Sequence, residues 1–272
     1  MKILYIHHCG PFGGSSRSLY EVLKLLSKNN IECIFICPSG SSAKKFRELG
    51  EVIEVKGLTK FDNTYYSHYQ GIRWFVLLRE LYYLPQSLLA LIKVKIKHRN
   101  FNIVHFNESC LSVFGILVRL FFDSKFIVHC RTLMIGGDKI PGRLSNFLWD
   151  YLDSTYIAID KNVAATFPAR FLREEGKATI IHNGFNTNLN YDLKIKKRKP
   201  EEIFHVGFVG ELHKAKGCYE LTQAVINLKR KGREINLTIV GDDEKKKTNQ
   251  SIRVKILKYL GLYQNISNDI HK

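Results

Sequence analysis

Residues 203–221 have the types and spacing of an anion-binding site. The run 204–209 is apolar and rich in β-branched residues, which is typical of a strand buried in a parallel sheet. Gly210 ends this strand, and Gly217 opens a helix whose apolar residues recur at helical spacing. A helix N-terminus binds phosphate-like anions through free N–H groups and its dipole, and Lys216 adds a positive charge there. On spacing alone, an ordinary strand–turn–helix connection with a solvated lysine is an equally good interpretation.

The same residues carry a resemblance to a known family. The segment is similar to the start of the C-terminal domain of retaining glycosyltransferases with the GT-B fold, the GT4 or group 1 family. In that family a Gly-Arg pair and a Lys-Gly pair hold the diphosphate of a nucleotide-sugar donor. Gly210, Lys216 and Gly217 match this pattern, and Gly241 matches a later strand-end glycine. Glu211 stands at the Arg position, where it replaces a phosphate-binding cation with an anion. The resemblance implies that these five residues belong to a donor-binding site.

A glycine-containing loop near the N-terminus extends the resemblance. A predicted strand at 2–7 is followed by Gly13 and Gly14 and then by a helix, which is the opening of a Rossmann-type unit. The spacing differs from the G-x-G-x-x-G motif of dinucleotide binding, so it disfavours an NAD site. In the glycosyltransferase family this loop approaches the donor phosphates or the acceptor. Without the resemblance, the two glycines are residues that a tight turn needs.

His129 is the catalytic candidate. It ends a predicted strand at 125–129, and ligand sites in open α/β sheets lie at such carboxyl ends. In the family a histidine at this strand end faces the transferred sugar. A lone histidine is otherwise more often structural. Asn183 and Gly184 resemble the family's Asn-Gly crossover between its two domains.

The predicted elements alternate between strands and helices, which indicates an α/β fold. With the resemblance, we expect the GT-B type: two Rossmann-like domains with parallel sheets, the second one truncated. The expected boundaries are an acceptor-side domain at 1–184, a basic linker at 185–202 and a partial donor-side domain at 203–272. Strands are predicted at 2–7, 31–37, 52–55, 101–106, 125–129, 155–159, 179–182, 204–209 and 235–240.

Three segments between these strands carry proline or glycine signals. The stretch that begins at Ile72 is predicted to form two helical pieces broken near Pro85. Residues 134–142 are glycine-rich and predict either a mobile lid or a plain connector. Residues 162–173 predict one helix that is strained near Pro168.

The composition is that of a globular protein with a strong positive charge. The chain has 272 residues, of which 45% are hydrophobic, and its net charge is +17. This charge favours anionic partners. A nucleic-acid-binding function rests on charge alone, because no RRM, KH, helix-turn-helix or zinc signature is present, and we expect no nucleic-acid partner. The six cysteines form no C-x-x-C pair, so we expect reduced core cysteines and no metal site.

The stretch 72–92 is the most apolar in the chain, but Arg79, Glu80 and Pro85 argue against a membrane span. Trp74 and Tyr82, together with the basic run 93–99, are typical of a helix that lies on an anionic membrane surface. A helix packed on the sheet with a solvated basic end fits the sequence equally well. The N-terminus shows no secretory signal.

The resemblance implies a function. It is the transfer of a sugar from a UDP- or GDP-linked donor to a glycan or lipid-linked acceptor, in cell-surface polysaccharide synthesis. The implied location is the cytoplasm, with peripheral contact at the inner face of the membrane and no separate cofactor. The family's E-x7-E pair, which binds the donor, does not occur in this sequence. The alternative is therefore a non-catalytic, truncated remnant that binds a nucleotide sugar or a partner protein.

Overall fold

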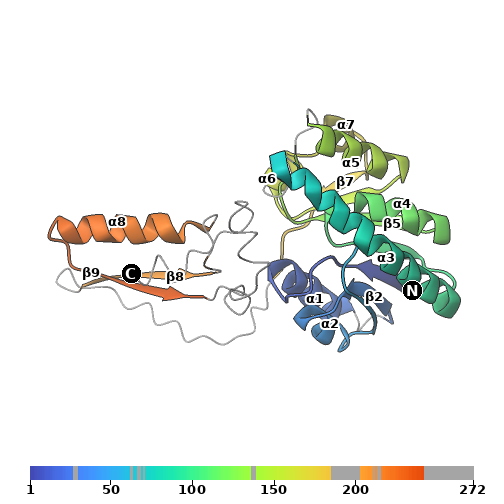
Figure 1. Cartoon of the computed structure of the whole chain (residues 1–272), viewed down its shortest axis with the longest axis horizontal. Coiled ribbons are helices and arrows are strands. Elements are labelled where there is room, and N and C mark those ends of the chain that lie inside the picture. Colours follow the sequence, from blue (N-terminus) through green and yellow to red (C-terminus); the bar gives the residue numbers. More distant parts are fainter. Residues whose placement is uncertain are drawn as a thin grey trace. The chain divides into compact units, whose positions relative to one another are not determined.

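A computed structural model describes residues 1–26, 30–61, 64–65, 69, 71–135, 139–184, 203–210, 212 and 216–241 (Figure 1). The chain divides into two compact units, Met1–Asn190 and Tyr191–Lys272. Glu211 and the predicted linker 185–202 lie outside the described residues.

The first unit is built on a parallel sheet of seven strands in the order β3-β2-β1-β4-β5-β6-β7. The chain runs outward from β1 to β3, returns to β4 beside β1, and then runs outward in the other direction. This order is that of a doubly wound Rossmann-like sheet, whose direction reverses between β1 and β4. The strands are β1 (Lys2–Ile6), β2 (Glu32–Pro38), β3 (Glu51–Val55), β4 (Ile103–Phe106), β5 (Lys125–Cys130), β6 (Thr155–Ala158) and β7 (Ala178–Ile180).

Helices cover both faces of this sheet, because each strand buries alternate residues on opposite sides. Ile3 and Tyr5 of β1 pack under α1 (Gly14–Leu26) and α2 (Ser41–Phe46). Leu4 and Ile6 belong to the larger core on the other face. That core is covered by α3 (Val76–His98), α4 (Ser112–Phe121) and α5 (Ile140–Tyr151). Two 3₁₀ turns, η2 (Gly71–Phe75) and η3 (Ser109–Leu111), lead into α3 and α4. The predicted α/β fold is confirmed.

The predicted helix break near Pro85 is wrong. Pro85 lies inside α3, which continues from Val76 to His98, and the irregular part is η2 before it. A proline removes the hydrogen bond to the carbonyl four residues earlier, here that of Leu81. Leu81 is 65% exposed, so it lies on the outer side of the helix, where water can replace the lost donor. Packing of the opposite side on the sheet then holds the helix together.

Two other predictions for helical segments need correction. The segment 162–173 is not one strained helix: α6 (Lys161–Ala164) and α7 (Ala169–Arg173) are separate, with Pro168 at the N-cap of α7. A proline pre-sets the first turn of a helix and cannot continue the one before it. The loop predicted at 134–142 is shorter, because α5 begins at Ile140 and takes Pro141 into its first turn. The glycines at 136 and 137 lie outside the described residues.

The described part of the second unit has two parallel strands and one helix: β8 (Phe204–Val209), α8 (Cys218–Arg230) and β9 (Ile235–Val240). The prediction of a buried strand at 204–209 is wrong for this structure. Phe204 and Val209 are both exposed. In the described residues only α8 packs against the two strands, and its buried positions are Cys218 and Val225. One helix covers one face of a sheet, so the other face of β8 is left exposed.

Among the described helices, the one that spans 71–98 is long and apolar enough to cross a membrane by length and composition alone. Only 22% of its apolar window is buried inside the fold. Its inner side nevertheless belongs to the core, through Ala90, Leu91 and Val94.

Candidate functional site

A buried polar cluster lies where the sheet reverses direction. The carboxyl ends of β1, β4 and β5 are neighbours there, and each is followed by a polar residue: His7, Asn107 and Arg131. This is the position at which open α/β sheets bind ligands. We call the group the edge cluster; its members are His7, Ser16, Ser18, His105, Asn107, Glu108, His129, Arg131 and Asn183.

Arg131 is the centre of the edge cluster. Its Nε donates to Oδ1 of Asn107 at 2.7 Å, and its Nη1 donates to Oγ of Ser18 at 2.8 Å. The same Nη1 donates to Oδ1 of Asn183 at 3.0 Å, and Ser18 also donates to that oxygen at 2.6 Å. The side chain is only 8% exposed, and burial lowers the pKa of Arg131 to about 10. Arg131 is therefore charged at neutral pH and joins three segments that are far apart in sequence.

His7 is held as a neutral imidazole with a defined tautomer. Nδ2 of Asn107 donates to Nδ1 of His7 at 2.9 Å, so the proton of His7 lies on Nε2 and donates to Oγ of Ser16 at 2.8 Å. Ser16 in turn donates to the carbonyl of Pro11. Burial, with a smaller effect from the charge of Arg131, lowers the pKa of His7 to about 3. This network fixes the loop after β1 to the end of β4.

His129 is neutral as well, and its Nε2 is a buried donor. Nη2 of Arg131 lies 3.3 Å from Nδ1 of His129 and donates to it, which leaves the imidazole proton on Nε2. Nε2 is buried and has no hydrogen-bond partner among the described residues. Burial, followed by the charges of Arg131 and His105, lowers the pKa of His129 to about 2. The ring stands perpendicular to that of His105, with 5.6 Å between the ring centroids. His129 can therefore donate a hydrogen bond but cannot act as an acid near neutral pH.

Glu108 is the carboxylate of the edge cluster. It accepts from the backbone N–H of Ser109 at 3.0 Å and from that of Arg131 at 3.4 Å. Burial raises the pKa of Glu108, and the positive charge of Arg131 lowers it by less. In return, the negative charge of Glu108 raises the pKa of Arg131. Glu108 thus ties the end of β4 to the end of β5. Sequence reasoning did not single out Ser18, Asn107 or Glu108; the available signal was that Asn107 and Glu108 directly follow a predicted strand.

Gly13 and Gly14 lie at the start of α1, which carries Ser16 and Ser18 of the edge cluster. The idea that a tight turn needs these glycines is wrong, because neither has a left-handed φ. A Cβ atom added at either position would meet nothing within 4 Å. The two glycines therefore leave open space in front of the helix N-terminus, where a ligand has room to approach the backbone.

The donor-site candidates of the second unit lie at the carboxyl ends of its strands. Gly210 follows β8 and Gly241 follows β9, and the two are in direct contact: a Cβ on Gly241 would overlap the carbonyl oxygen of Gly210. Gly217 is the N-cap of α8, with a left-handed φ of 75°, and the exposed Lys216 precedes it. A lysine at a helix N-terminus suits a phosphate.

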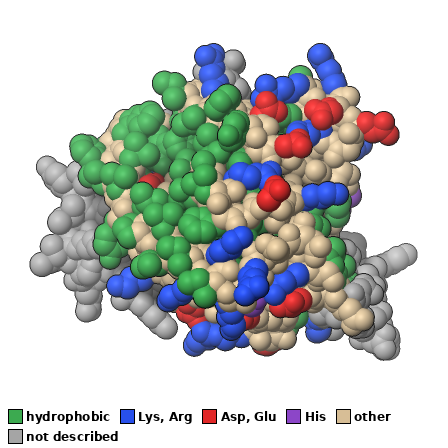
Figure 2. Space-filling view, turned by 90° about the vertical axis from the view of Figure 1, so that its right-hand side faces the viewer, with side chains coloured by type: hydrophobic (Ala, Val, Ile, Leu, Met, Phe, Trp, Pro, Cys, Tyr) green, Lys and Arg blue, Asp and Glu red, His purple; other side chains and the backbone are tan. Residues whose placement is uncertain are grey.

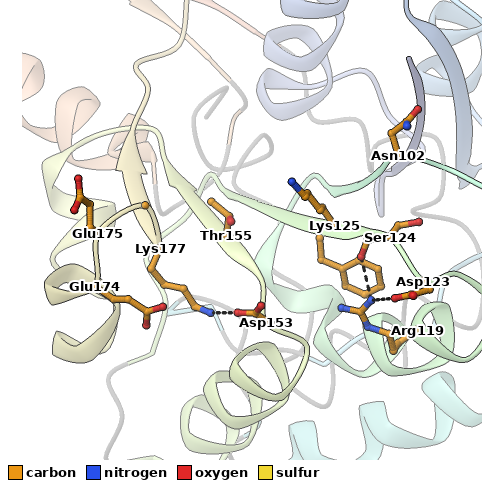
Figure 3. Close-up of a pocket in the computed structure, with 12 residues that line it drawn as sticks. Asn102, Arg119, Asp123, Ser124, Lys125, Asp153, Thr155, Glu174, Glu175 and Lys177 are labelled. Carbon is orange, nitrogen blue, oxygen red and sulfur yellow. Dashed lines mark hydrogen bonds and ion pairs between the residues drawn. The ribbon is translucent and has the colours of Figure 1, made fainter.

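A cavity of about 590 Å³ lies at the opposite, amino edge of the sheet and is a poor candidate (Figure 3). Two of the cations that line it are paired with neighbouring carboxylates. Lys177 points to Asp153, with 2.7 Å between Nζ and Oδ1, and Arg119 points to Asp123 at 3.3 Å. No group of three or more His, Cys, Asp or Glu side chains in the described residues is arranged to hold a metal ion.

The comparison with protein families decides the classification. The sequence model of Glycosyltransferase Family 4 matches residues 12–189, which include every member of the edge cluster except His7. The chain belongs to glycosyltransferase family 4. No curated protein matches it.

Solved structures share the fold of this family 4 chain. HepE from Anabaena, solved in complex with UDP-glucose, is 17% identical, with a TM-score of 0.60 over 97% of this chain and 67% of its own. A glycosyltransferase from Rickettsia africae is 18% identical, with a TM-score of 0.55, and the match covers 99% of this chain and 69% of that one. The lipopolysaccharide outer core galactosyltransferase WaaB is 14% identical, with a TM-score of 0.53, and the match covers 99% of this chain and 70% of WaaB. The chain spans about two thirds of the length of these structures.

Within this family 4 chain, the structure sorts the predicted site residues into two groups. His129 belongs to the edge cluster of the first unit, and Gly13 and Gly14 open the helix that contributes to it. The second group, at the carboxyl ends of the second unit's strands, is Gly210, Lys216, Gly217 and Gly241. Their roles in binding and catalysis stay predictions.

Proposed function

We propose that this chain binds a UDP- or GDP-linked sugar and transfers the sugar to a glycan or lipid-linked acceptor in cell-surface polysaccharide synthesis. Transfer takes place in the cytoplasm, at the inner face of the membrane. Membership of glycosyltransferase family 4 supports the reaction class. The solved complexes of HepE with UDP and with UDP-glucose support a uracil-nucleotide donor. WaaB, which acts on lipopolysaccharide, supports a cell-surface glycan as the acceptor.

In this proposal, the second unit holds the leaving group. The diphosphate gains negative charge as the bond to the sugar breaks. The N-terminus of α8 and the ammonium of Lys216 stabilise that charge, and such preorganised electrostatic stabilisation is commonly the largest catalytic effect. Gly210 and Gly241 carry no side chain at the strand ends, so the diphosphate can approach the backbone there.

The observation that carries the proposal is the Arg131–His129 hydrogen bond. It orients the imidazole, fixes its proton on Nε2 and leaves that donor unpaired among the described residues. An unpaired buried donor costs roughly 1–3 kcal/mol, and a sugar hydroxyl that reaches this edge would supply the acceptor. His129 therefore contacts the sugar as a neutral donor, and Arg131 is its positioning residue.

Glu211 favours one alternative, donor or partner binding without transfer. An anion at the position of the family's phosphate-binding Arg repels a diphosphate. A chain of this kind would bind a nucleotide sugar weakly and release no free nucleotide.

A transfer assay tests the proposal. The purified chain is incubated with radioactively labelled UDP- and GDP-sugars and a membrane extract from the producing cells. We expect label in the butanol-soluble lipids or in precipitated polysaccharide, together with free nucleotide. In His129→Phe we expect at least about a tenfold slower transfer, which corresponds to about 1.4 kcal/mol of lost stabilisation.

The matched control is His98→Phe. His98 lies at the amino edge, 3.2 Å from Glu51, and far from the edge cluster in the sheet. This variant keeps the parent rate. A folded chain that binds donor, but yields neither labelled product nor free nucleotide, contradicts transfer and establishes the binding-only alternative.

A further inference from the structure

The helices α3, α4 and α5 carry apolar side chains on their outer faces as well as toward the core. On α3, Leu91 and Val94 are completely buried against the sheet. The opposite side of the same helix has a second apolar stripe, whose members are spaced by three, eight, three and four residues, with Pro85 in the widest gap. A helix that only packs on a sheet has polar residues on that side, because it faces water. The members of this stripe are Leu78, Leu81, Leu89, Ile92 and Ile96, all exposed.

The next two helices continue this pattern. On α5, Trp149 is buried in the core, whereas four residues on the other side are exposed at spacings of four, three and four: Ile140, Leu144, Phe147 and Tyr151. On α4, Leu120 is exposed, and Val113, Ile116 and Leu117 on the same side are half-buried. Because α4 contacts both α3 and α5, the three stripes adjoin.

These stripes form one surface, which we call the outer apolar surface: the outward sides of the segment 71–98, of α4 and of α5. More than half of the exposed large hydrophobic side chains in the described residues belong to it. Figure 2 shows the side of the molecule on which α3 and α4 lie. Hydrophobic side chains cover a broad, continuous area there, and lysine and arginine side chains gather at its border. A contiguous apolar area of this kind marks an interaction site rather than an ordinary surface.

The charge around the outer apolar surface defines the partner. At about 100° per residue, Lys93 and Lys97 lie on one flank of the α3 stripe and Lys95 lies on the other. Trp74 and Tyr82, which combine an apolar ring with a polar group, are exposed on the same segment. Apolar residues flanked by cations and interfacial aromatic residues match a bilayer with anionic headgroups.

We propose that the outer apolar surface binds an anionic lipid bilayer, with α3 lying in the plane of the headgroups. The helix does not cross the membrane, because its inner side is part of the core and carries the buried Glu80. A second copy of the chain fits less well. A two-fold contact places the same surface of both copies together, so it would bring the flanking lysines of one copy near those of the other. Lipid headgroups neutralise these charges instead.

This docking serves the proposed function, since it would bring the chain to a lipid-linked acceptor, but its test needs no sugar donor. Failure of vesicle binding and failure of transfer are therefore separate results. The full chain is sedimented with vesicles of phosphatidylcholine alone and of phosphatidylcholine mixed with phosphatidylglycerol. We expect strong binding only to the anionic vesicles, and weaker binding at high salt, because salt screens the headgroup charge.

Two matched pairs of variants locate the surface. Leu81 on α3 and Leu25 on α1 are 65% and 67% exposed, but they cover opposite faces of the sheet. We expect Leu81→Gln to lower the vesicle partition coefficient about tenfold and Leu25→Gln to leave it unchanged. For the charge, Lys93→Gln is compared with Lys44→Gln on α2, and only the former weakens binding to the anionic vesicles.

Circular dichroism confirms that each variant is folded. Three results overturn the proposal: a folded chain that binds no anionic vesicles, equal losses in Leu81→Gln and Leu25→Gln, or equal binding to neutral and anionic vesicles. Light scattering tests whether a second copy covers the surface instead. A stable dimer that binds no vesicles and that dissociates in Leu81→Gln would show that it does.

Discussion

Arg131 donates a hydrogen bond to the side-chain oxygen of Asn183, with 3.0 Å between Nη1 and Oδ1. Arg131 directly follows β5, and Asn183 comes three residues after the end of β7. The pair therefore connects the central strands to the point at which the chain leaves the first unit's sheet. Through Ser18 the same guanidinium also reaches α1, and through Nη2 it orients His129. One buried cation thus organises the carboxyl edge of the sheet.

Replacement of Arg131 by Lys tests this organisation. Lysine keeps the charge but has no planar fork, so it cannot donate to Asn107, Ser18 and Asn183 together. We expect Arg131→Lys to lower the free energy of unfolding by about 3 kcal/mol, because buried acceptors lose charged donors. Urea denaturation followed by circular dichroism measures the change. In Arg170→Lys, an exposed surface pair with Asp150, the loss stays below about 0.5 kcal/mol. Equal losses in the two variants would show that Arg131 is not the organising group.

Acid sensitivity follows from the buried histidines. The pKa values of His7 and His105 are lowered to about 3 and that of His129 to about 2, against 6.5 for a free histidine. Below pH 6.5 these histidines bind protons in the unfolded chain but not in the folded chain. The free energy of unfolding therefore has its full value above pH 6.5 and falls as the pH drops toward 3. In this range each of these histidines lowers the free energy of unfolding by about 1.4 kcal/mol for each unit by which the pH falls.

Urea denaturation at a series of pH values between 7.5 and 4.5 tests this dependence. In His105→Phe we expect the slope of unfolding free energy against pH to fall by about 1.4 kcal/mol per unit, because one titrating ring is gone. An unfolding free energy that does not change between pH 7 and 5 would contradict neutral, buried histidines.

Two glycine substitutions separate a structural from a ligand-binding role. Gly14 begins α1 with open space around it, so Gly14→Ala keeps the stability or raises it by up to about 1 kcal/mol. In α4, a Cβ on Gly115 would lie 2.9 Å from the side chains of Leu152 and Trp149. Gly115→Ala therefore lowers the stability by about 1–3 kcal/mol. Thermal unfolding of both variants checks these values.

The same Gly14→Ala variant tests whether a ligand approaches the start of α1. If the backbone there contacts substrate, the variant transfers sugar more slowly although it is as stable as the parent chain. An unchanged transfer rate would remove Gly14 from the site and leave it as the first residue of α1 alone.

The strands and the fold class could be predicted from the sequence because apolar, β-branched runs are local signals. The prediction at 125–129, for example, corresponds to β5 at Lys125–Cys130. The helix at Pro85 could not be predicted, because its continuity depends on packing of the far side of α3 on the sheet. The exposure of β8 was missed for a similar reason: an apolar run does not show how many faces are covered.

Part of the candidate site followed from a family pattern and part did not. The resemblance to family 4 is confirmed, and it pointed to His129 and to the Lys216–Gly217 pair. His7, Ser18 and Asn107 match no motif and are far apart in the sequence. His7 and Asn107 meet because β1 and β4 are neighbours in the sheet, and Ser18 is joined to Asn107 through Arg131 at the end of β5. Strand order is not a local property of the sequence.

The central claim is that the chain binds a nucleotide sugar, and calorimetric titration with UDP, GDP and their sugars tests it most directly. The parent chain is compared with Lys216→Ala and with Lys229→Ala, a lysine in the last turn of the same helix. We predict saturable binding that Lys216→Ala weakens at least about tenfold and Lys229→Ala preserves, since the N-terminal end of α8 attracts anions and its C-terminal end does not. No binding by a folded sample, or equal binding by both variants, would contradict the donor site.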